Sequence, residues 1–364
     1  MEVTIGKACK LHLPQLALDL AEAFEDSSVR RLDVQVWVDV LAACATNLWG
    51  EGVSRSWQKV VKELNITPDE GCCLLILTTV ARHGLASLGL EVLQVIKGLN
   101  VAWEEYHIAP ILEAFCRVGN VQQAFEMLSL MRSSHIHPTT ETTQPLFEVL
   151  CSLPGAIDEA WGILDELHQK GKIIDVTALN VILQAAIAIG DLQTALGAYK
   201  AAQSLDVQPN IDTFNLLFAG CIATEQRQLA DRLLTEMRDA HIRPDVRTYE
   251  RLITLCLTQV TYEDAFFYLE EMKAAGHVPP LAIYEALVQK CIHTGDPRAQ
   301  LALEEMRECG YEPTLDLKRV LNAGAGSLTQ PPRSGFTSAG GEQQGEGAEA
   351  EQGRRRTRSP RVVL

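Results

Sequence analysis

The feature that most constrains the fold of this chain is an internal repeat of 35 residues. The segment Thr213–Leu217 aligns with Thr248–Leu252, and Ala178–Ile182 falls in the same place one step upstream. Three kinds of residue keep this period to within one position: alanines 124, 160, 195, 230 and 265, prolines 209, 244 and 279, and glycines 84, 119, 155, 190 and 295. A fixed period of this length is typical of repeat proteins.

Each repeat predicts a helical hairpin. Residues 212–223 carry apolar side chains at helical spacing, and residues 226–241 resume as a second amphipathic helix. Glycine suits the turn between the two helices, because it adopts positive φ at little cost. Alanine suits the place where two helices approach closely, and proline follows the second helix, which it cannot continue. One hairpin cannot bury its own apolar face, so the sequence predicts an all-α fold, an α-solenoid of about nine stacked hairpins.

The register of the repeat divides the chain. Residues 1–33 predict a partial repeat, in which Glu2–Phe24 forms a hairpin, and residues 34–314 hold the α-solenoid. The first turn, Thr46–Val53, is expected to be longer than the others. Residues 315–323 predict a capping helix, and residues 324–364 predict a disordered tail that is rich in Gly, Ser, Gln, Glu and Arg. The tail ends in a basic cluster, Arg354–Arg361, with three open interpretations: contact with RNA phosphates, a regulatory or nuclear arginine-serine segment, or solubility.

The repeats resemble the pentatricopeptide repeat family. The resemblance is carried by Thr248-Tyr249, Phe266–Met272 and Gly276-His277-Val278-Pro279, and by Thr213-Phe214-Asn215 running to Ile242-Arg243-Pro244-Asp245. It implies a binding adaptor for single-stranded organellar RNA that supports RNA processing, stability or translation, with ribosomal or RNA-processing proteins as further partners. In such arrays one base is read by each helical repeat.

The resemblance also implies which residues contact RNA. The family's base-reading positions fall on Asn180 with Asn210, and on Asn215 with Asp245, and both combinations resemble pyrimidine readers, the second favouring uracil. Arg247 and Lys200 are the candidates for phosphate contacts.

Other repeats depart from this pattern. Their reading positions pair Ala109 with Thr139, Pro145 with Asp175, Glu250 with Pro280, and Glu285 with Thr314, and the position expected to sandwich a base holds Thr177, Asp212 and Arg247. The chain carries a net charge of −15, which disfavours contact with phosphates. Six arginines and four glutamates lie in residues 324–364, so residues 1–323 carry −17. The alternative is therefore a protein–protein scaffold, ribosome-associated or in complex assembly, that keeps the fold without reading RNA.

Catalysis and metal binding are not expected. Cysteines 116, 151, 221, 256 and 291 recur at multiples of 35, which predicts small buried side chains rather than ligands or disulfides. The chain has neither a C-x-x-C nor an H-E-x-x-H motif, and the catalytic modules that some family members append have no place after Thr314. We expect no enzyme activity, cofactor, small-molecule substrate or membrane span.

Localisation is predicted from the resemblance alone, which implies mitochondria or plastids. Met1–Phe24 shows no Arg-rich, acid-poor presequence, and Met1 falls inside the first helix of a repeat. We therefore expect a chain whose amino-terminal part is incomplete; if Met1 is the true start, a cytosolic or nuclear location is the alternative.

Overall fold

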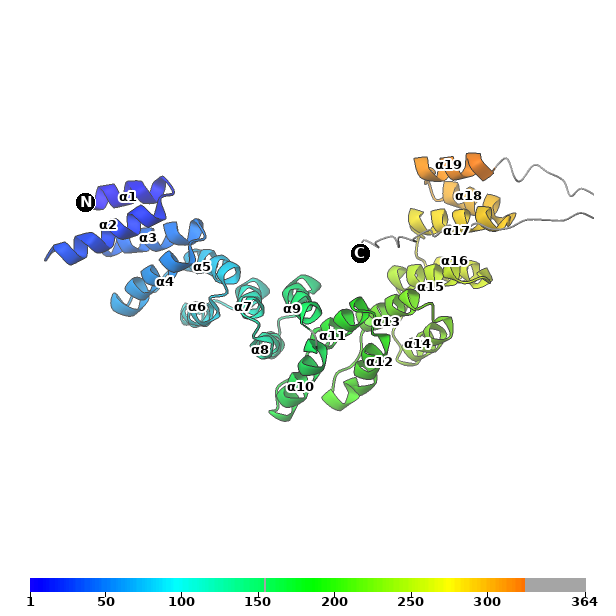
Figure 1. The fold of residues 1–364 in the computed structure, drawn as a ribbon, viewed down its shortest axis with the longest axis horizontal. Helices are drawn as coiled ribbons and strands as arrows, with labels where there is room; N and C mark the ends of the chain where they lie inside the picture. Colours follow the sequence, from blue (N-terminus) through cyan, green and yellow to red (C-terminus); the bar gives the residue numbers. More distant parts are fainter. Residues whose placement is uncertain (154, 325–364) are drawn as a thin grey trace, which may run out of the picture. The chain divides into compact units, whose positions relative to one another are not determined.

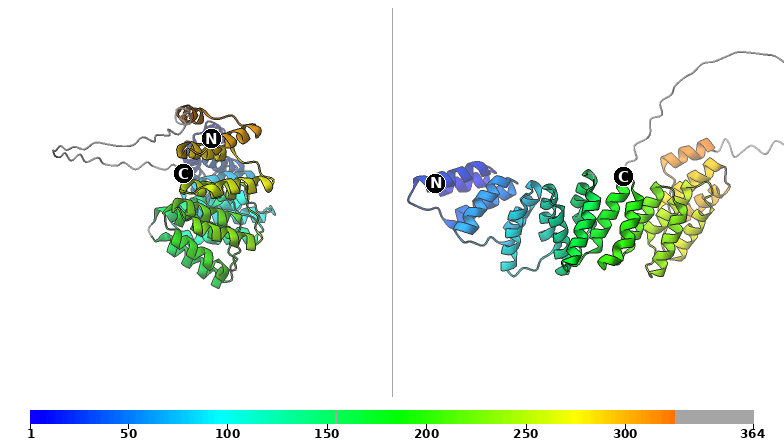
Figure 2. Two further views of the ribbon diagram at one scale, coloured as in Figure 1. Left: turned by 90° about the vertical axis from the view of Figure 1, so that its right-hand side faces the viewer. Right: turned by 60° about the horizontal axis from the view of Figure 1, so that its bottom comes forward.

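The computed structural model describes residues 1–153 and 155–324, and these residues form helices without any strand. Residues 1–313 make up one unit, in which the helices alternate between two layers (Figures 1 and 2). The first helices of the hairpins are α1 (Glu2–Lys10), α3 (Val34–Thr46), α5 (Glu70–His83), α7 (Glu105–Arg117), α9 (Thr140–Ser152), α11 (Val176–Ala188), α13 (Ile211–Ala223), α15 (Val246–Thr258) and α17 (Leu281–Thr294).

The second helices are α2 (Pro14–Ser27), α4 (Gly50–Trp57), α6 (Ala86–Gly98), α8 (Val121–Ser133), α10 (Ala156–Gln169), α12 (Leu192–Ala201), α14 (Arg227–Asp239), α16 (Glu263–Ala274) and α18 (Arg298–Glu308). Each first helix contacts the first helix of the next hairpin, from α1 to α17. Several second helices, such as α6 and α12, also contact the first helix that follows them. The described chain thus forms nine stacked hairpins, which confirms the predicted α-solenoid.

A helix cap marks the start of each repeat. The caps of α3, α5, α7, α9, α11, α13, α15 and α17 are Asp33, Asp69, Glu104, Thr139, Asp175, Asn210, Asp245 and Pro280. Five of them accept a hydrogen bond from a backbone N–H of the first turn through a carboxylate or amide oxygen. Such a bond satisfies a donor that has no partner within the helix.

The core confirms the roles predicted for the periodic residues. The recurring alanines 124, 160, 195, 230 and 265 have no exposed surface, and Gly89 stands one repeat earlier in the same series. A Cβ at Gly89 would lie 2.9 Å from Val80 and 3.0 Å from Ile111, so the second helix approaches its neighbours too closely there for a larger residue. The turn glycine Gly84 has φ +68°, as predicted for a left-handed turn.

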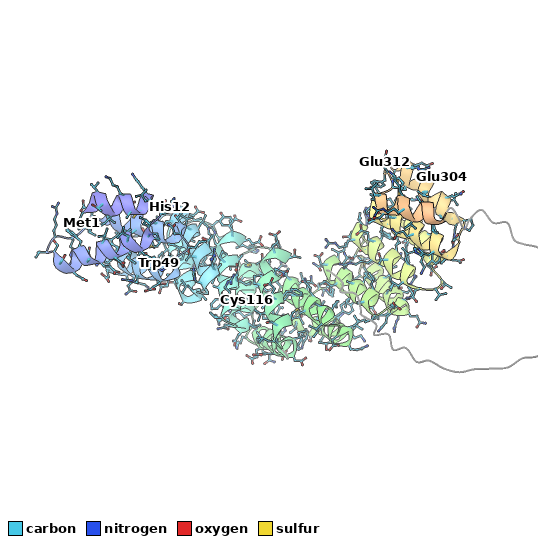
Figure 3. The ribbon with its side chains drawn as sticks, turned by 45° about the horizontal axis from the view of Figure 1, so that its top comes forward. Met1, His12, Trp49, Cys116, Glu304 and Glu312 are labelled. Carbon is cyan, nitrogen blue, oxygen red and sulfur yellow. The ribbon has the colours of Figure 1, made fainter. Side chains whose placement is uncertain are left out.

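Four of the five periodic cysteines are buried as the sequence predicts, and the fifth, Cys151, is not fully buried. Cys44, Cys72, Cys73, Cys116, Cys221, Cys256 and Cys291 are free and buried, whereas Cys9 and Cys151 are half-buried and Cys309 is exposed. Cys116, labelled in Figure 3, lies in α7, and burial raises the pKa of its thiol to about 12. A buried thiol with a raised pKa is a poor nucleophile at neutral pH.

Two features of the predicted register are wrong. The turn expected to be long, Thr46–Val53, is a short connection from Asn47 to Trp49, in which Leu48 adopts φ +52°. The extra residue of this repeat is taken up after α4 by a π-helical turn, η1 (Gln58–Glu63), whose wider hydrogen bonding accommodates one more residue.

The second error concerns α9. The reading position lies five residues after the helix cap, as Asn215 lies after Asn210. Thr139 caps α9, so the reading position of this repeat is Gln144 and not Pro145. The extra residue of this repeat lies later, because Gly155 is one residue further from Thr139 than Gly119 is from Glu104.

Two further segments complete the description. Residues 202–205 form a short 3-10 turn, η2 (Ala202–Leu205), after α12, and α19 (Leu315–Gly324) begins where the capping helix was predicted. α19 belongs to a second unit, residues 314–364, and its role as a cap stays a prediction. The predicted tail, with Arg354–Arg361, lies outside the described residues from 325 onward. In the part that is described, no helix is both long and apolar enough to cross a bilayer.

Candidate RNA interface

The four predicted base-reading residues meet in two equivalent places, between α11 and α13 and between α13 and α15. The amide of Asn180 donates a hydrogen bond to Oδ1 of Asn210 at 3.2 Å. One repeat later, the amide of Asn215 donates to Oδ1 of Asp245 at 3.2 Å. The structure thus brings both predicted pairs together with the same geometry, although the members of each pair are separated by 30 residues.

A threonine that was not predicted as part of the site completes each pair. Oγ1 of Thr213 lies 2.7 Å from Oδ1 of Asn180, and Oγ1 of Thr248 lies 3.0 Å from Oδ1 of Asn215. The backbone N–H groups of these threonines donate to the caps, Asn210 at 3.0 Å and Asp245 at 2.8 Å. Each pair is therefore part of the capping network of the following helix. The signal in the sequence was present as Asn-x-x-Thr and Asp-x-x-Thr at the same phase of the repeat.

These bonds leave a defined set of polar groups without a partner in the described residues. The Nδ2 atom of Asn215 carries two hydrogens, of which one is directed at Asp245, and Oδ2 of Asp245 accepts no hydrogen bond. This second pair therefore offers one donor and one acceptor. In the first pair, Nδ2 of Asn180 keeps a second hydrogen and Nδ2 of Asn210 makes only a long contact with Asp212, at 3.5 Å. The first pair therefore offers mainly donors.

Burial and charge differ between the two members of the second pair. Asn215 is only 2% exposed, while Asp245 is half-buried. Burial pushes the pKa of Asp245 upward, but hydrogen bonds from Thr248 and Asn215 and the nearby charge of Arg247 outweigh it and hold this pKa below its ordinary value. The carboxylate is thus ionised at neutral pH.

The two phosphate candidates lie in different layers. Arg247 is exposed in the first turn of α15, close enough to Asp245 to lower its pKa. Lys200 is exposed at the end of α12, a second helix, and makes no hydrogen bond or ion pair within the described residues. The structure brings Arg247 to the second pair, whereas Lys200 lies on a second helix.

One cation beside the second pair was missed by the sequence reasoning. Arg251 stands one helical turn after Arg247, and its Nη1 atom is buried without a hydrogen-bond partner among the described residues. Desolvation lowers the pKa of Arg251, and the charge of Arg247 lowers it further. A recurring pattern could not have revealed Arg251, because Leu216 and Val181 occupy the same position in the two preceding repeats.

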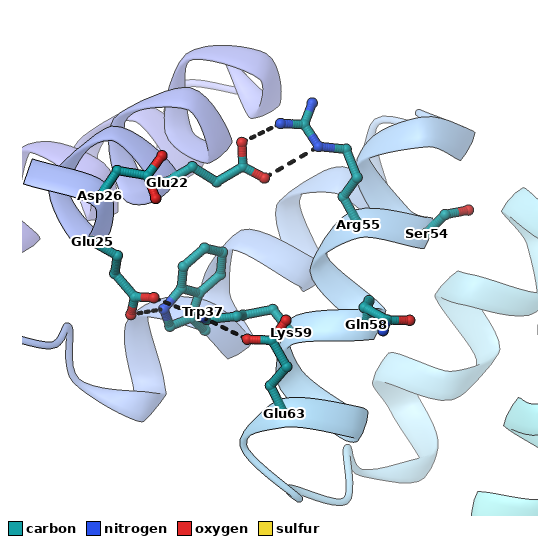
Figure 4. A pocket seen from close by; sticks show the side chains of 9 residues that line it. All are labelled: Glu22, Glu25, Asp26, Trp37, Ser54, Arg55, Gln58, Lys59 and Glu63. Atoms are coloured by element: carbon teal, nitrogen blue, oxygen red, sulfur yellow. Dashed lines mark hydrogen bonds and ion pairs between the residues drawn. The ribbon is translucent and has the colours of Figure 1, made fainter.

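The remaining reading positions hold groups of other kinds. The amide of Gln144 donates to Glu148 at 3.1 Å, and Ala109 has no polar side chain. A pocket of about 470 Å³ lies between α2, α3 and the α4–η1 segment, and both of its cations are already paired: Lys59 with Glu25 and Glu63, and Arg55 with Glu22 (Figure 4). No group of three or more metal-binding side chains is found in residues 1–153 or 155–324.

Known proteins share the repeat. A sequence model described as a pentatricopeptide repeat-containing protein matches residues 70–202, and a model described as a pentatricopeptide repeat domain matches residues 200–259 and 232–293. The chain is 30% identical over 166 residues to the Arabidopsis thaliana pentatricopeptide repeat-containing protein At1g26460, mitochondrial, covering 41% of this chain and 26% of that protein. It is 28% identical over 109 residues to the human pentatricopeptide repeat-containing protein 1, mitochondrial, covering 29% of this chain and 16% of that protein.

A third relative and one solved structure complete the comparison. The Arabidopsis thaliana pentatricopeptide repeat-containing protein At3g29230 is 22% identical over 206 residues, covering 46% of this chain and 33% of that protein, so the matched part is a third or less of each relative's length. The crystal structure of the pentatricopeptide repeat protein PPR10 in complex with an 18-nt psaJ RNA element superposes with a TM-score of 0.45 at 18% identity, covering 86% of this chain and 45% of that chain. The two sequence models together span residues 70–293, which include the hairpins from α5 to α16. The chain belongs to the pentatricopeptide repeat family.

Proposed function

We propose that this chain is a binding adaptor for single-stranded RNA, and that Asn180 with Asn210 and Asn215 with Asp245 contact two neighbouring bases. The observation that carries the proposal is the repetition of the same amide-to-cap hydrogen bond in consecutive repeats, at 3.2 Å in both. Family membership supports it, because helical repeats of this kind read one base each.

The polar groups left over by these bonds indicate which bases fit. Uracil presents a carbonyl acceptor beside its N3–H donor, which matches the free amide hydrogen of Asn215 and the free oxygen of Asp245. Cytosine presents acceptors at N3 and O2, which match the two amide donors of Asn180 and Asn210. The proposed preference is therefore for cytosine at the first pair and for uracil at the second.

The two arginines beside the second pair favour a small contribution of phosphate contacts to the RNA affinity. Arg247, exposed near Asp245, is the proposed phosphate contact beside the second pair, and Arg251 adds a desolvated positive charge next to it. Affinity then depends more on the base contacts than on general attraction, in keeping with the net charge of −15.

The biological setting belongs to the same proposal. Two of the relatives carry "mitochondrial" in their names, which supports an organellar transcript as the RNA and a mitochondrial location for this chain. We propose that the bound RNA is protected or presented to the proteins that process or translate it, and that the chain itself performs no catalysis.

Titration of labelled oligouridine, oligocytidine and oligoadenosine by fluorescence anisotropy tests the proposal. We expect the pyrimidine oligomers to bind more tightly than oligoadenosine, and we expect Asn215→Ala to weaken oligouridine binding by roughly tenfold, the value of one lost base contact. Gln300→Ala, which removes an exposed amide from α18, is the matched control and should leave binding unchanged. Absence of binding to every oligomer at low salt, where phosphate contacts are strongest, would reject the proposal.

A further inference from the structure

A second surface on the first-helix layer has a different character from the reading pairs. A groove of about 540 Å³ runs over α5, α7 and α9, and we name it the Tyr106 groove after the one aromatic residue in its described lining. Its apolar lining comes from Leu74, Tyr106, Ala109, Pro110 and Pro145, with Glu141 beside them. Tyr106 is 52% exposed, which is unusual for a large aromatic side chain in a packed array.

In the reading pairs, an asparagine amide bonds the cap of the next first helix. At the Tyr106 groove, a glutamate carboxylate bonds this cap instead. Between α7 and α9 the next cap, Thr139, is bonded by the carboxylate of Glu105, which accepts from its backbone N–H at 3.1 Å and from its hydroxyl at 2.8 Å. The position of Asn180 and Asn215 is therefore free to hold Ala109, which has no group that can bond a base edge. The reading position of this repeat therefore contributes no base-edge hydrogen bond to the groove.

Two prolines give the groove backbone acceptors instead. Pro110 and Pro145 lie inside α7 and α9, each six residues after the helix cap. Proline has no N–H, so Pro110 cannot donate to the carbonyl of Tyr106, and Pro145 cannot donate to the carbonyl of Glu141. The carbonyl groups of these two lining residues have thus lost their usual helical donors.

The charge on the α7–α9 side is negative. These two helices carry the four glutamates Glu105, Glu113, Glu141 and Glu148 and a single arginine, Arg117, which is paired with Glu113 at 2.8 Å. Glu141 is exposed and has no partner among the described residues, and Arg82 of α5 also lines the groove. A second cavity of about 510 Å³ shares Glu113, Glu141 and Pro145 with the groove and extends it along α9 to Glu148.

We propose that the Tyr106 groove is the docking site for a segment of a partner protein that carries apolar side chains together with lysine or arginine. The basic groups of the partner satisfy Glu141, Glu148 and the two freed carbonyls, and its apolar side chains pack on the exposed face of Tyr106 and on the proline rings. A half-exposed tyrosine bordered by acidic side chains is the kind of anchor that dominates protein–protein binding. An RNA strand in the same place would bring its phosphates against the glutamates. The function that follows is recruitment: α11–α15 hold the RNA, and α5–α9 hold the protein.

The test uses two synthetic peptides of equal length on the full chain, one alternating leucine and arginine and the other alternating leucine and glutamate. Fluorescence anisotropy should show binding of the basic peptide and none of the acidic one. Tyr106→Ala and Glu141→Lys should each lower the affinity for the basic peptide by at least roughly tenfold. Phe267→Ala, which removes a 62%-exposed aromatic ring from α16, is the matched control and should change nothing.

The outcomes separate this proposal from RNA binding. Asn215→Ala should leave peptide affinity unchanged, and Tyr106→Ala should leave oligouridine affinity unchanged. The docking proposal is overturned if the basic peptide does not bind, or if it binds Tyr106→Ala and Glu141→Lys as tightly as the unaltered chain. It is also overturned if Tyr106→Ala lowers the affinity for RNA, because the groove would then be part of the RNA path. Unchanged melting curves of both variants, monitored by circular dichroism, show that a loss of binding is not a loss of fold.

Discussion

The carboxylate of Asp245 caps α15 through Thr248 and also accepts a hydrogen bond from Asn215. A residue proposed to read a base therefore already contributes to the stability of the array. Replacing a capping carboxylate by alanine costs about 1 kcal/mol. Any loss of RNA binding in Asp245→Ala must for this reason be compared with the melting temperature of the same variant.

The low pKa of Asp245 predicts how that stability depends on pH. The pKa is below its ordinary value of 3.8 in the folded chain, so the cap's contribution is fully present above that value and is lost as the pH falls through the folded pKa. We expect the difference in melting temperature between the unaltered chain and Asp245→Ala to be constant from neutral pH down to about pH 5 and to shrink below pH 4. Thermal melts across this range measure it; a difference that grows on acidification would contradict the network.

The cysteines give an independent check on burial. Cys309 is exposed, Cys9 and Cys151 are half-buried, and the other seven are buried, with the pKa of Cys44 raised by burial to about 12. We expect a thiol reagent at neutral pH to modify Cys309 fast, Cys9 and Cys151 slowly, and the remaining seven only after denaturation. Mass spectrometry of timed samples assigns the modified sites, and fast modification of Cys116 or Cys256 would show that the first helices are not packed as described.

In the second helices α6 to α16, a recurring small residue lies where the helix packs closely against its neighbours. In α14 this residue is Ala230, which is fully buried, whereas Gln228 on the same helix is exposed. We expect Ala230→Leu to lower stability by about 1–3 kcal/mol through overpacking, and Gln228→Leu to change it little. Urea unfolding of both variants tests the close approach; equal effects would mean that α14 is not wedged between its neighbours.

The helices were predictable because periodic residues report a local requirement that most repeats share. Thr213 and Thr248 repeat at the same phase, and so do the buried alanines. The register of α9 was not predictable from spacing alone, since the extra residue of that repeat could lie on either side of the helix, and only the cap at Thr139 places Gln144 five positions after it. The prediction of a long turn at Thr46–Val53 was wrong for a similar reason, because η1 accommodates the extra residue by a change of helical hydrogen bonding.

The candidate site was predictable only in part. Asn180, Asn210, Asn215 and Asp245 followed from the family's pattern, and the structure brings each pair within hydrogen-bonding distance. Arg251 and the Tyr106 groove did not follow from it, since each depends on a residue found in one repeat and not in its neighbours. Features unique to one repeat carry no periodic signal.

The net charge of the whole chain, −15, limits how RNA can be held. With Arg247 and Arg251 as the cations near the reading pairs, few phosphates are neutralised on binding. We expect the logarithm of the RNA affinity to fall with the logarithm of the salt concentration with a slope of about −1, as one or two phosphate contacts to a single strand imply. Titrations over a range of salt measure this slope, and a much steeper one would indicate an extended basic surface elsewhere on the chain.

The proposed role of the reading pairs is tested most directly by Asp245→Asn, which makes the second pair chemically identical to the first. Asparagine also caps helices well, so the fold is retained. Selection from a random pool of single-stranded RNA should enrich cytosine followed or preceded by uracil with the unaltered chain. With the variant, the uracil should change to cytosine while its neighbour stays the same. Enrichment of the same sequence by both proteins, or of none by either, would contradict base reading by Asn215 and Asp245.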